Sequence, residues 1–184
     1  MDGVGIWREA DRERLNLREG IDAWSPIAMR ELRDTARRYH AVITYKELGA
    51  AVQEGSGVRT KLLLQNWIGK LLEDVARIAK DEREPPLTSL CVRQNGTIGG
   101  GYARAPKSTD DQVGEDIEMY AAQHRLLCYR RYASDLPDDG GVPALTREEK
   151  ARRSRPAPRA DVVRPLCPVH YMELSAAGTC ALCE

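Results

Sequence analysis

Phenylalanine is absent from the 184-residue sequence, so three tryptophans and seven tyrosines supply all of its aromatic bulk. No stretch approaches the ~18 consecutive apolar residues of a membrane-spanning helix, and we therefore expect no membrane partner. The first residues are charged and lack an apolar run, which speaks against a signal peptide and predicts a cytoplasmic protein. In the cytoplasm, the five cysteines are expected to be metal ligands or buried thiols rather than disulfides.

An excess of either charge is also missing, since 28 basic residues balance 28 acidic ones. Non-specific coating of nucleic acid needs a large positive excess, so the total speaks against that class of protein. Any nucleic-acid contact must then come from how the charges are distributed. Charged residues make up 30% and hydrophobic residues 42%, which is typical of a globular chain. The length suits one ordinary domain with a small appendage.

A first helix is predicted to begin at Ser25, because serine caps helices and Pro26 needs no N–H in the first turn. The preceding residues, 1–24, are interpreted as an N-terminal arm, either a short packed helix or a loose segment. A second helix is expected after Thr44, which can form a capping box with Glu47.

The most regular pattern follows, and it predicts a long amphipathic helix from about Thr60 to Lys80. A β-hairpin is expected next, with Asn95-Gly96 as its turn and Ile98 opening the return strand. A short helix, a longer helix and a hairpin in this order are the layout of a winged helix-turn-helix. The apolar residues that define the long helix recur at spacings of three and four: Leu64, Trp67, Ile68, Leu71, Leu72, Val75, Ile78 and Ala79.

A further helix is expected before the composition changes at Ser134. Residues 134–165 are rich in proline, glycine and charged residues, and are interpreted as a linker with one helical turn after Thr146. Between Arg147 and Arg164 this segment carries seven basic and three acidic residues. Such a segment suits either a tether that contacts phosphates or a solubilising spacer.

The C-terminal residues contain two ligand pairs, each with a two-residue gap, separated by nine residues: Cys167, His170, Cys180 and Cys183. A two-residue gap lets both ligand atoms of a pair face one metal from a tight turn, and two such pairs complete a tetrahedron. Four protein ligands leave no position for water, so the predicted zinc is structural rather than catalytic. So short a segment cannot bury a core, and metal binding should supply its folding free energy.

Together these patterns predict an α+β fold. The main part is a mostly helical winged helix-turn-helix domain with a β-hairpin wing, formed by residues 25–133 with flanking helices. The N-terminal arm, 1–24, precedes it and the linker, 134–165, follows it. A small zinc ribbon over residues 166–184 ends the chain.

Three stretches of the central third resemble the winged-helix domain of the O6-alkylguanine-DNA alkyltransferases and their alkyltransferase-like relatives. Residues 44–48, TYKEL, resemble the "TYG-x-[LIV]-A" helix of that family, and residues 66–70, NWIGK, resemble its "R-x-V-G-x-A" helix. Residues 96–102, GTIGGGY, resemble its "G-x-x-G-G-Y" wing with one extra glycine. The resemblance implies a DNA-binding scaffold.

The same alignment implies that the alkyl-transfer chemistry is absent. The spacing from Gly96 puts Thr88 where the family has its alkyl-accepting cysteine. In the second matched stretch, Asn66 stands where the family inserts an arginine into the base stack. Cys91 lies three residues later with no His-Arg after it, and a cysteine acceptor needs an activating base. We therefore expect Cys91 to be a core thiol.

The function predicted from these features is that of a non-enzymatic nucleic-acid-binding protein, with DNA as the expected partner and zinc as the cofactor. Composition rich in Arg, Ala and Gly suits a bacterium of high GC content or its phage. The candidate nucleic-acid contacts are the donor-bearing residues of the long helix and around the wing: Lys61, Gln65, Asn66, Lys70, Arg93, Arg104 and Lys107.

Two other functions remain open. Charge neutrality and a mixed surface fit a protein–protein adaptor better than a DNA-binding protein; such an adaptor would use the winged helix for docking. An enzyme, such as a nuclease or a degenerate alkyltransferase, is the third reading, because acids near Asp110 and Glu115 can bind a hydrolytic metal, although they also suit a helix N-terminus. No nucleophile–base set and no open metal site supports it.

Overall fold

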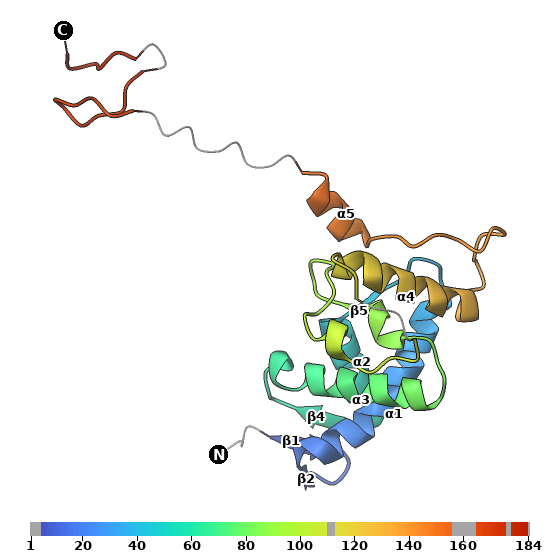
Figure 1. Ribbon diagram of the computed structural model, residues 1–184. Helices are drawn as coiled ribbons and strands as arrows, with labels where there is room; N and C mark the ends of the chain where they lie inside the picture. The colour runs from blue at the N-terminus through green and yellow to red at the C-terminus, as the bar shows by residue number, and fades with distance from the viewer. Residues whose placement is uncertain (1–4, 110–112, 156–164, 176–177, 184) are drawn as a thin grey trace. The chain divides into compact units, whose positions relative to one another are not determined.

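The computed structural model describes residues 5–109, 113–155, 165–175 and 178–183. The chain divides into two compact units, residues 1–153 and 154–184 (Figure 1). The predicted linker, 134–165, spans this division. No helix in the described residues is both long and apolar enough to cross a bilayer.

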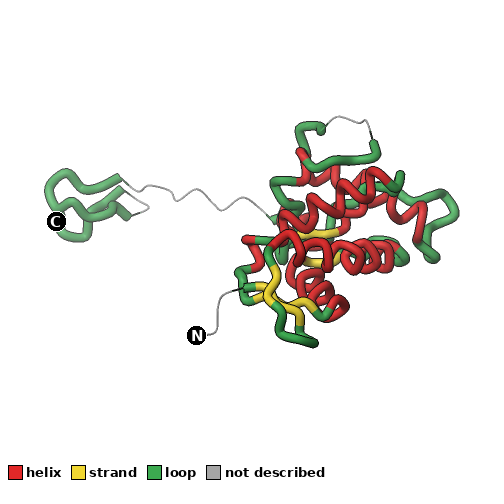
Figure 2. The backbone as a smooth tube through the Cα atoms, turned by 90° about the horizontal axis from the view of Figure 1, so that it is seen from below, coloured by secondary structure: helices red, strands yellow, loops and turns green. Residues whose placement is uncertain are grey.

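The first unit has a mixed α+β fold in which helices dominate (Figure 2). Its strands form a three-stranded antiparallel sheet of order β2-β1-β4 and a separate parallel pair, β3 and β5. The strands are β1 Ile6–Arg8, β2 Arg14–Leu15, β3 Ile43–Thr44, β4 Val58–Thr60 and β5 Cys91–Val92. The helices are α1 Leu17–Ala36, α2 Tyr45–Ser56, α3 Ile68–Asp81, α4 Ile117–Tyr132 and α5 Arg147–Arg153.

The predicted start of the first helix at Ser25 is wrong, because α1 begins eight residues earlier. Asn16 caps it and forms a capping box with Glu19, which satisfies N–H groups at that end. Pro26 lies inside the helix, and Ser25 is buried with its hydroxyl donating to Asp74 at 2.8 Å. The helix cap therefore lies at Asn16, within the segment that is predicted to be an N-terminal arm.

The residues before Ser25 are therefore part of the folded body. Ile6 in β1 is buried, and Trp24 is fully buried with its indole N–H donating to the Val58 carbonyl at 2.9 Å. The Trp24 ring lies 4.5 Å from that of Trp67, centroid to centroid. Large aromatic surface removed from water makes this pair a centre of the core.

The helix after Thr44 is confirmed, with its capping box, and Gly57 ends it in the left-handed conformation at φ 65°. The helix predicted from Thr60 begins later, at Ile68. Residues 58–60 pair with β1 instead, and residues 64–66 form one 3-10 turn before α3. Beyond that point the apolar stripe behaves as predicted, and Leu71, Val75 and Ala79 are buried.

The predicted β-hairpin wing is wrong. Residues 87–90 form a buried 3-10 turn, and β5 pairs in parallel with β3, Cys91 lying opposite Ile43. The turn at Gly96 forms, but the Ile98 N–H donates to the Glu118 carboxylate at 2.9 Å rather than to a partner strand. The glycines that follow lead into a 3-10 turn over residues 102–104.

Residues 134–153 pack on the first unit rather than forming an open linker. The hydroxyl of Thr146 donates to the Gly96 carbonyl at 2.8 Å. The Arg153 guanidinium pairs with the Asp116 carboxylate through contacts of 2.6 and 2.9 Å, which ties α5 to the start of α4. The one helical turn predicted after Thr146 is part of α5.

Candidate metal centre and nucleic-acid interface

The second unit brings its four ligands together with two short turns. The Cys167 N–H donates to the Met172 carbonyl at 2.8 Å, and the Tyr171 N–H donates to the Cys167 carbonyl at 2.9 Å. A single antiparallel bridge between Leu166 and Glu173 closes this first turn. The second turn is closed by the Cys183 N–H, which lies 3.2 Å from the Cys180 carbonyl oxygen.

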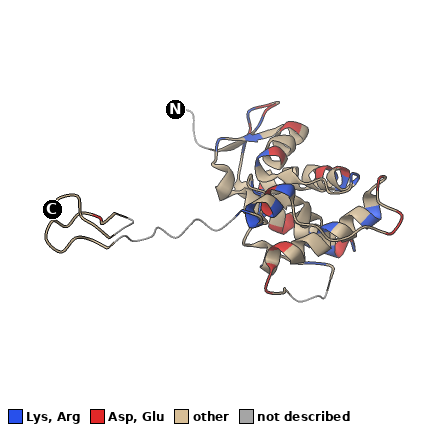
Figure 3. Cartoon of the chain, turned by 90° about the horizontal axis from the view of Figure 1, so that it is seen from above, with Lys and Arg blue, Asp and Glu red and all other residues tan. Residues whose placement is uncertain are grey.

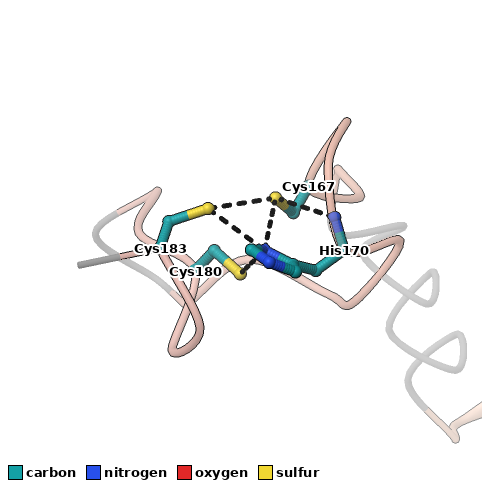
Figure 4. Close-up of side chains that lie close together, drawn as sticks. All are labelled: Cys167, His170, Cys180 and Cys183. Carbon is teal, nitrogen blue, oxygen red and sulfur yellow. Dashed lines mark hydrogen bonds between the residues drawn. The ribbon is translucent and has the colours of Figure 1, made fainter.

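Cys167, His170, Cys180 and Cys183 face one another, and their ligand atoms all lie within 4.8 Å of each other (Figure 4). The Cys167 and Cys183 sulfurs are 3.6 Å apart. The Nδ1 atom of His170 lies 3.8 Å from the Cys167 sulfur, 3.7 Å from that of Cys180 and 3.2 Å from that of Cys183. The four can bind a metal ion.

The donor set and its spacing fit zinc. Bonds of about 2.3 Å to sulfur and 2.0 Å to nitrogen in a tetrahedron put neighbouring ligand atoms roughly 3.5 to 3.8 Å apart. Four of the six separations, 3.2 to 3.8 Å, fall at or close to this range, and all six lie within 4.8 Å. Thiolates and imidazole together are the ligands that zinc prefers, whereas magnesium and calcium prefer oxygen.

The local backbone prepares one thiol for metal binding. Backbone N–H groups of His170 and Val169 lower the pKa of Cys167 to about 6. The thiolate is the form of cysteine that binds metal. Hydrogen bonding with Cys167 raises the pKa of Cys183 to about 11, so a metal ion must displace a proton there.

In the first unit, three of the predicted nucleic-acid contacts line one cavity of about 890 Å³. Gln65 comes from the 3-10 turn before α3, Arg93 follows β5, and Arg104 lies in the turn over residues 102–104. Asn66 and Lys70 are exposed and lie beside Gln65 along the chain. Five of the seven candidates therefore belong to one region around the start of α3.

The wall of the cavity is largely apolar, and its residues are tightly packed. Gly99 packs against Tyr45, and a Cβ atom there would overlap the tyrosine hydroxyl. Thr88 and Cys91 lie deeper and are buried. Burial raises the pKa of Cys91, so its thiol stays protonated at neutral pH. The remaining lining residues include Leu64, Ile68, Leu72, Ile98 and Tyr102.

The other two candidates are placed differently. Lys107 is half-buried, and its ammonium donates to the Tyr102 and Ala105 carbonyls at 2.7 and 2.8 Å. It also lies 4.7 Å above the Tyr102 ring, so it stabilises the loop after the cavity. Lys61 is exposed just after β4 and does not line the cavity.

Sequence reasoning missed the contribution of Tyr45 and Thr88 to the cavity. Tyr45 had a signal, since it stands second in the stretch that resembles the alkyltransferase helix, and the glycines at 99–101 marked a close approach without naming its partner. The parallel pairing of β3 with β5 is what brings Tyr45 to this site. Nothing in the local sequence indicates that pairing.

Comparison of the chain with protein-family models, with characterised proteins and with solved structures finds no match. The cavity, the charges around it and the four candidate metal ligands are the features that bear on function.

Proposed function

We propose that this chain is a non-enzymatic DNA-binding protein that contacts DNA with the rim of the cavity at the start of α3. The observation that carries the proposal is the convergence of Gln65, Arg93 and Arg104, from three separate segments, on one cavity. Their amide and guanidinium groups donate to base edges and phosphates. Exposed Asn66 and Lys70 extend the same surface.

The cavity itself supports a role in holding an unstacked base. Its volume of about 890 Å³ lies within the range of ligand sites, and its walls are mostly apolar with polar groups at the rim. Proteins that hold a base outside the duplex use pockets of this character. Part of the wall, including Tyr45, Ile68 and Tyr102, comes from the stretches that resemble the alkyltransferase-like family, which favours a degenerate member of that scaffold.

Transfer of an alkyl group to this chain is not part of the proposal. The thiol of Cys91 is buried and its pKa is raised, so the nucleophilic thiolate is disfavoured. Thr88 stands in the position that the resemblance assigns to the acceptor. Hydrolysis by a metal at the nearby acids is disfavoured as well, because the Asp116 carboxylate is engaged by Arg153; Asp110 lies outside the described residues.

We further propose that the 3-10 turn and α3 act as the recognition segment of a helix-turn-helix. The loop over residues 93–104 then takes the place of a strand-paired wing. In the second unit, zinc held by the four ligands is structural, in the manner of a zinc ribbon.

One observation favours protein docking as a second function, carried by the second unit. Residues 165–184 contain no lysine or arginine, so this segment offers no side-chain cation to a phosphate (Figure 3). Several of its apolar side chains are exposed: Leu166, Val169, Tyr171, Met172 and Leu182. Such a surface suits a protein partner better than nucleic acid.

Fluorescence anisotropy with a labelled DNA duplex over a salt series tests the main proposal. We expect salt-dependent binding that weakens when Asn66 or Arg104 is replaced by alanine. Arg38→Ala, an exposed arginine near the end of α1, is the matched control and should leave the affinity unchanged. Absence of binding at low salt, or an affinity that ignores salt, would refute DNA binding and leave protein docking as the function to test.

A further inference from the structure

A second hollow of the first unit gathers positive charge. It has a volume of about 790 Å³ and lies where the C-terminal ends of α3 and α4 meet the segment over residues 105–109. Its basic lining residues are Lys80, Arg83, Lys107, Arg130 and Arg131, and the acidic one is Glu84. In a chain of zero net charge this is a marked local excess.

The one carboxylate does not cancel that excess. Glu84 is buried, and its oxygens lie 3.1 Å from the Arg33 guanidinium and 3.5 Å from that of Arg131. It also accepts a hydrogen bond from the Tyr132 hydroxyl. Arg33 and Arg131 therefore neutralise the charge of Glu84, and the remaining basic residues leave the hollow with an excess of positive charge.

Lys80 and Arg83 are the cations that remain available. Both side chains are exposed, and neither has a hydrogen-bond or ion-pair partner within the part of the chain that the structure describes. Arg130, in contrast, donates to the Gly140 carbonyl at 2.9 Å. Lysine at the end of a helix has an ordinary explanation, because it interacts favourably with the helix dipole.

Arg83 lacks that ordinary explanation. It lies past the end of α3 with φ 55°, in the left-handed conformation that glycine usually adopts at this position. The Glu84 N–H donates back to the Ala79 carbonyl at 2.8 Å, which completes a helix-ending motif. An arginine pays conformational strain here that glycine would avoid, and strained residues concentrate at functional positions.

We propose that this basic hollow binds phosphodiester groups of the DNA backbone, as a contact additional to the cavity rim. This rests on the proposed DNA binding. Leu72, at the cavity, and Lys80, at the hollow, are eight residues apart on α3, a rise of about 12 Å. That is roughly the width of the major groove, so the two sites can meet backbone on opposite sides of a groove. Exposed cations from separate segments suit a polyanion passing over the surface.

The test compares the double variant Lys80→Gln/Arg83→Gly with Arg12→Gly. Arg12 is an exposed arginine that also has a left-handed φ, 60°, and it lies outside the hollow. Affinity for a labelled duplex is measured between about 50 and 200 mM salt. Arg83→Gly alone and Arg12→Gly should both raise the thermal midpoint, because each relieves backbone strain.

Only the variants of the hollow should weaken DNA binding. Each lost phosphate contact should lower the salt slope by about 0.9 and the affinity roughly tenfold near 0.1 M salt. The inference is overturned, with DNA binding intact, if the double variant keeps the original slope and affinity. It falls together with the proposed function if the unaltered chain binds no duplex.

Discussion

The two units of this chain are stabilised in opposite ways. In the first, Trp24, Leu32, Leu48 and Leu71 are fully buried, so apolar side chains form a core. In the second, only two of the described side chains are buried, those of Cys167 and Cys180. Tyr171 is 77% exposed, and Leu166, Val169, Met172 and Leu182 are exposed as well.

The comparison shows where the folding free energy of each unit comes from. Burial of apolar surface can stabilise the first unit without a ligand. The second unit is too small to do this, and its ligand atoms are the groups that converge at its centre. Metal binding and folding are therefore expected to be one process in the second unit and unrelated processes in the first.

Removal of the metal should give the largest effect. A strong chelator, or Cys180→Ser, should unfold the described part of the second unit while the first unit keeps its thermal midpoint, because all four proposed ligands belong to the second unit. Amide NMR spectra of the full chain would show the loss of dispersion in that segment alone. Cys128→Ser, which removes a buried thiol of the first unit, should keep one zinc per chain by elemental analysis. If a chelator lowers the thermal midpoint of both units, metal binding does not stabilise the second unit alone and the comparison is wrong.

Truncation of the core should give the converse result. Trp24→Ala removes a fully buried ring and should lower the free energy of unfolding of the first unit by about 3–5 kcal/mol. Zinc affinity should stay as it was, measured by competition with a chelating dye. Chemical denaturation followed by tryptophan fluorescence and circular dichroism would measure the free energy of unfolding of the first unit. An altered zinc affinity would mean that the units are coupled.

Gly99 tests the cavity wall with a smaller effect. Gly99→Ala places a Cβ atom against the Tyr45 hydroxyl and should cost about 1–3 kcal/mol of stability. Tyr45→Phe removes that hydroxyl and should recover part of the loss in the double variant. Gly101→Ala is the matched control, since a Cβ there meets no atom within 4 Å. Equal costs at Gly99 and Gly101 would count against the close contact.

The smallest expected effect is the change with pH in the free energy of unfolding of the first unit. Burial of Asp74 opposes its ionisation, but hydrogen bonds from Ser25 and Arg77 outweigh it, with help from Arg18, and hold the pKa of that carboxyl below its usual value. A depressed folded pKa stabilises the protein above the unfolded value of about 3.9 and loses that effect as the pH falls through the folded value. Asp74→Asn should thus cost about 1.5–3 kcal/mol at neutral pH and less below about pH 4. Urea unfolding of the unaltered chain and of Asp74→Asn at several pH values would measure the cost at neutral pH and its decrease below about pH 4.

The features that could be predicted from the sequence depend on interactions between residues close together in the chain. The capping box at Thr44, the apolar stripe of α3 and the metal-ligand spacing each depend on residues a few positions apart. Four cysteine and histidine ligands at such spacing leave few alternatives, so the clustering of these four residues could be predicted from the sequence.

The features that could not be predicted from the sequence depend on pairing between residues far apart in the chain. The turn predicted at Asn95-Gly96 is confirmed, yet β5 pairs with β3 some fifty residues earlier, and the Ile98 N–H donates to the Glu118 carboxylate. Competition between a hairpin partner and a distant partner is settled by packing. The helix start at Ser25 failed for a related reason, because a stronger cap at Asn16 extends the helix through Pro26.

The packed segment before Ser154 bears on how the protein can be shortened. Composition suggests cutting after Tyr132, where proline and glycine begin to accumulate. Such a cut would discard Thr146 and Arg153, the anchors of the Gly96 turn and of the start of α4, and would leave the glycine loop beside the cavity without its support. A version trimmed at the natural division, after residue 153, retains those anchors and isolates the first unit for crystallisation.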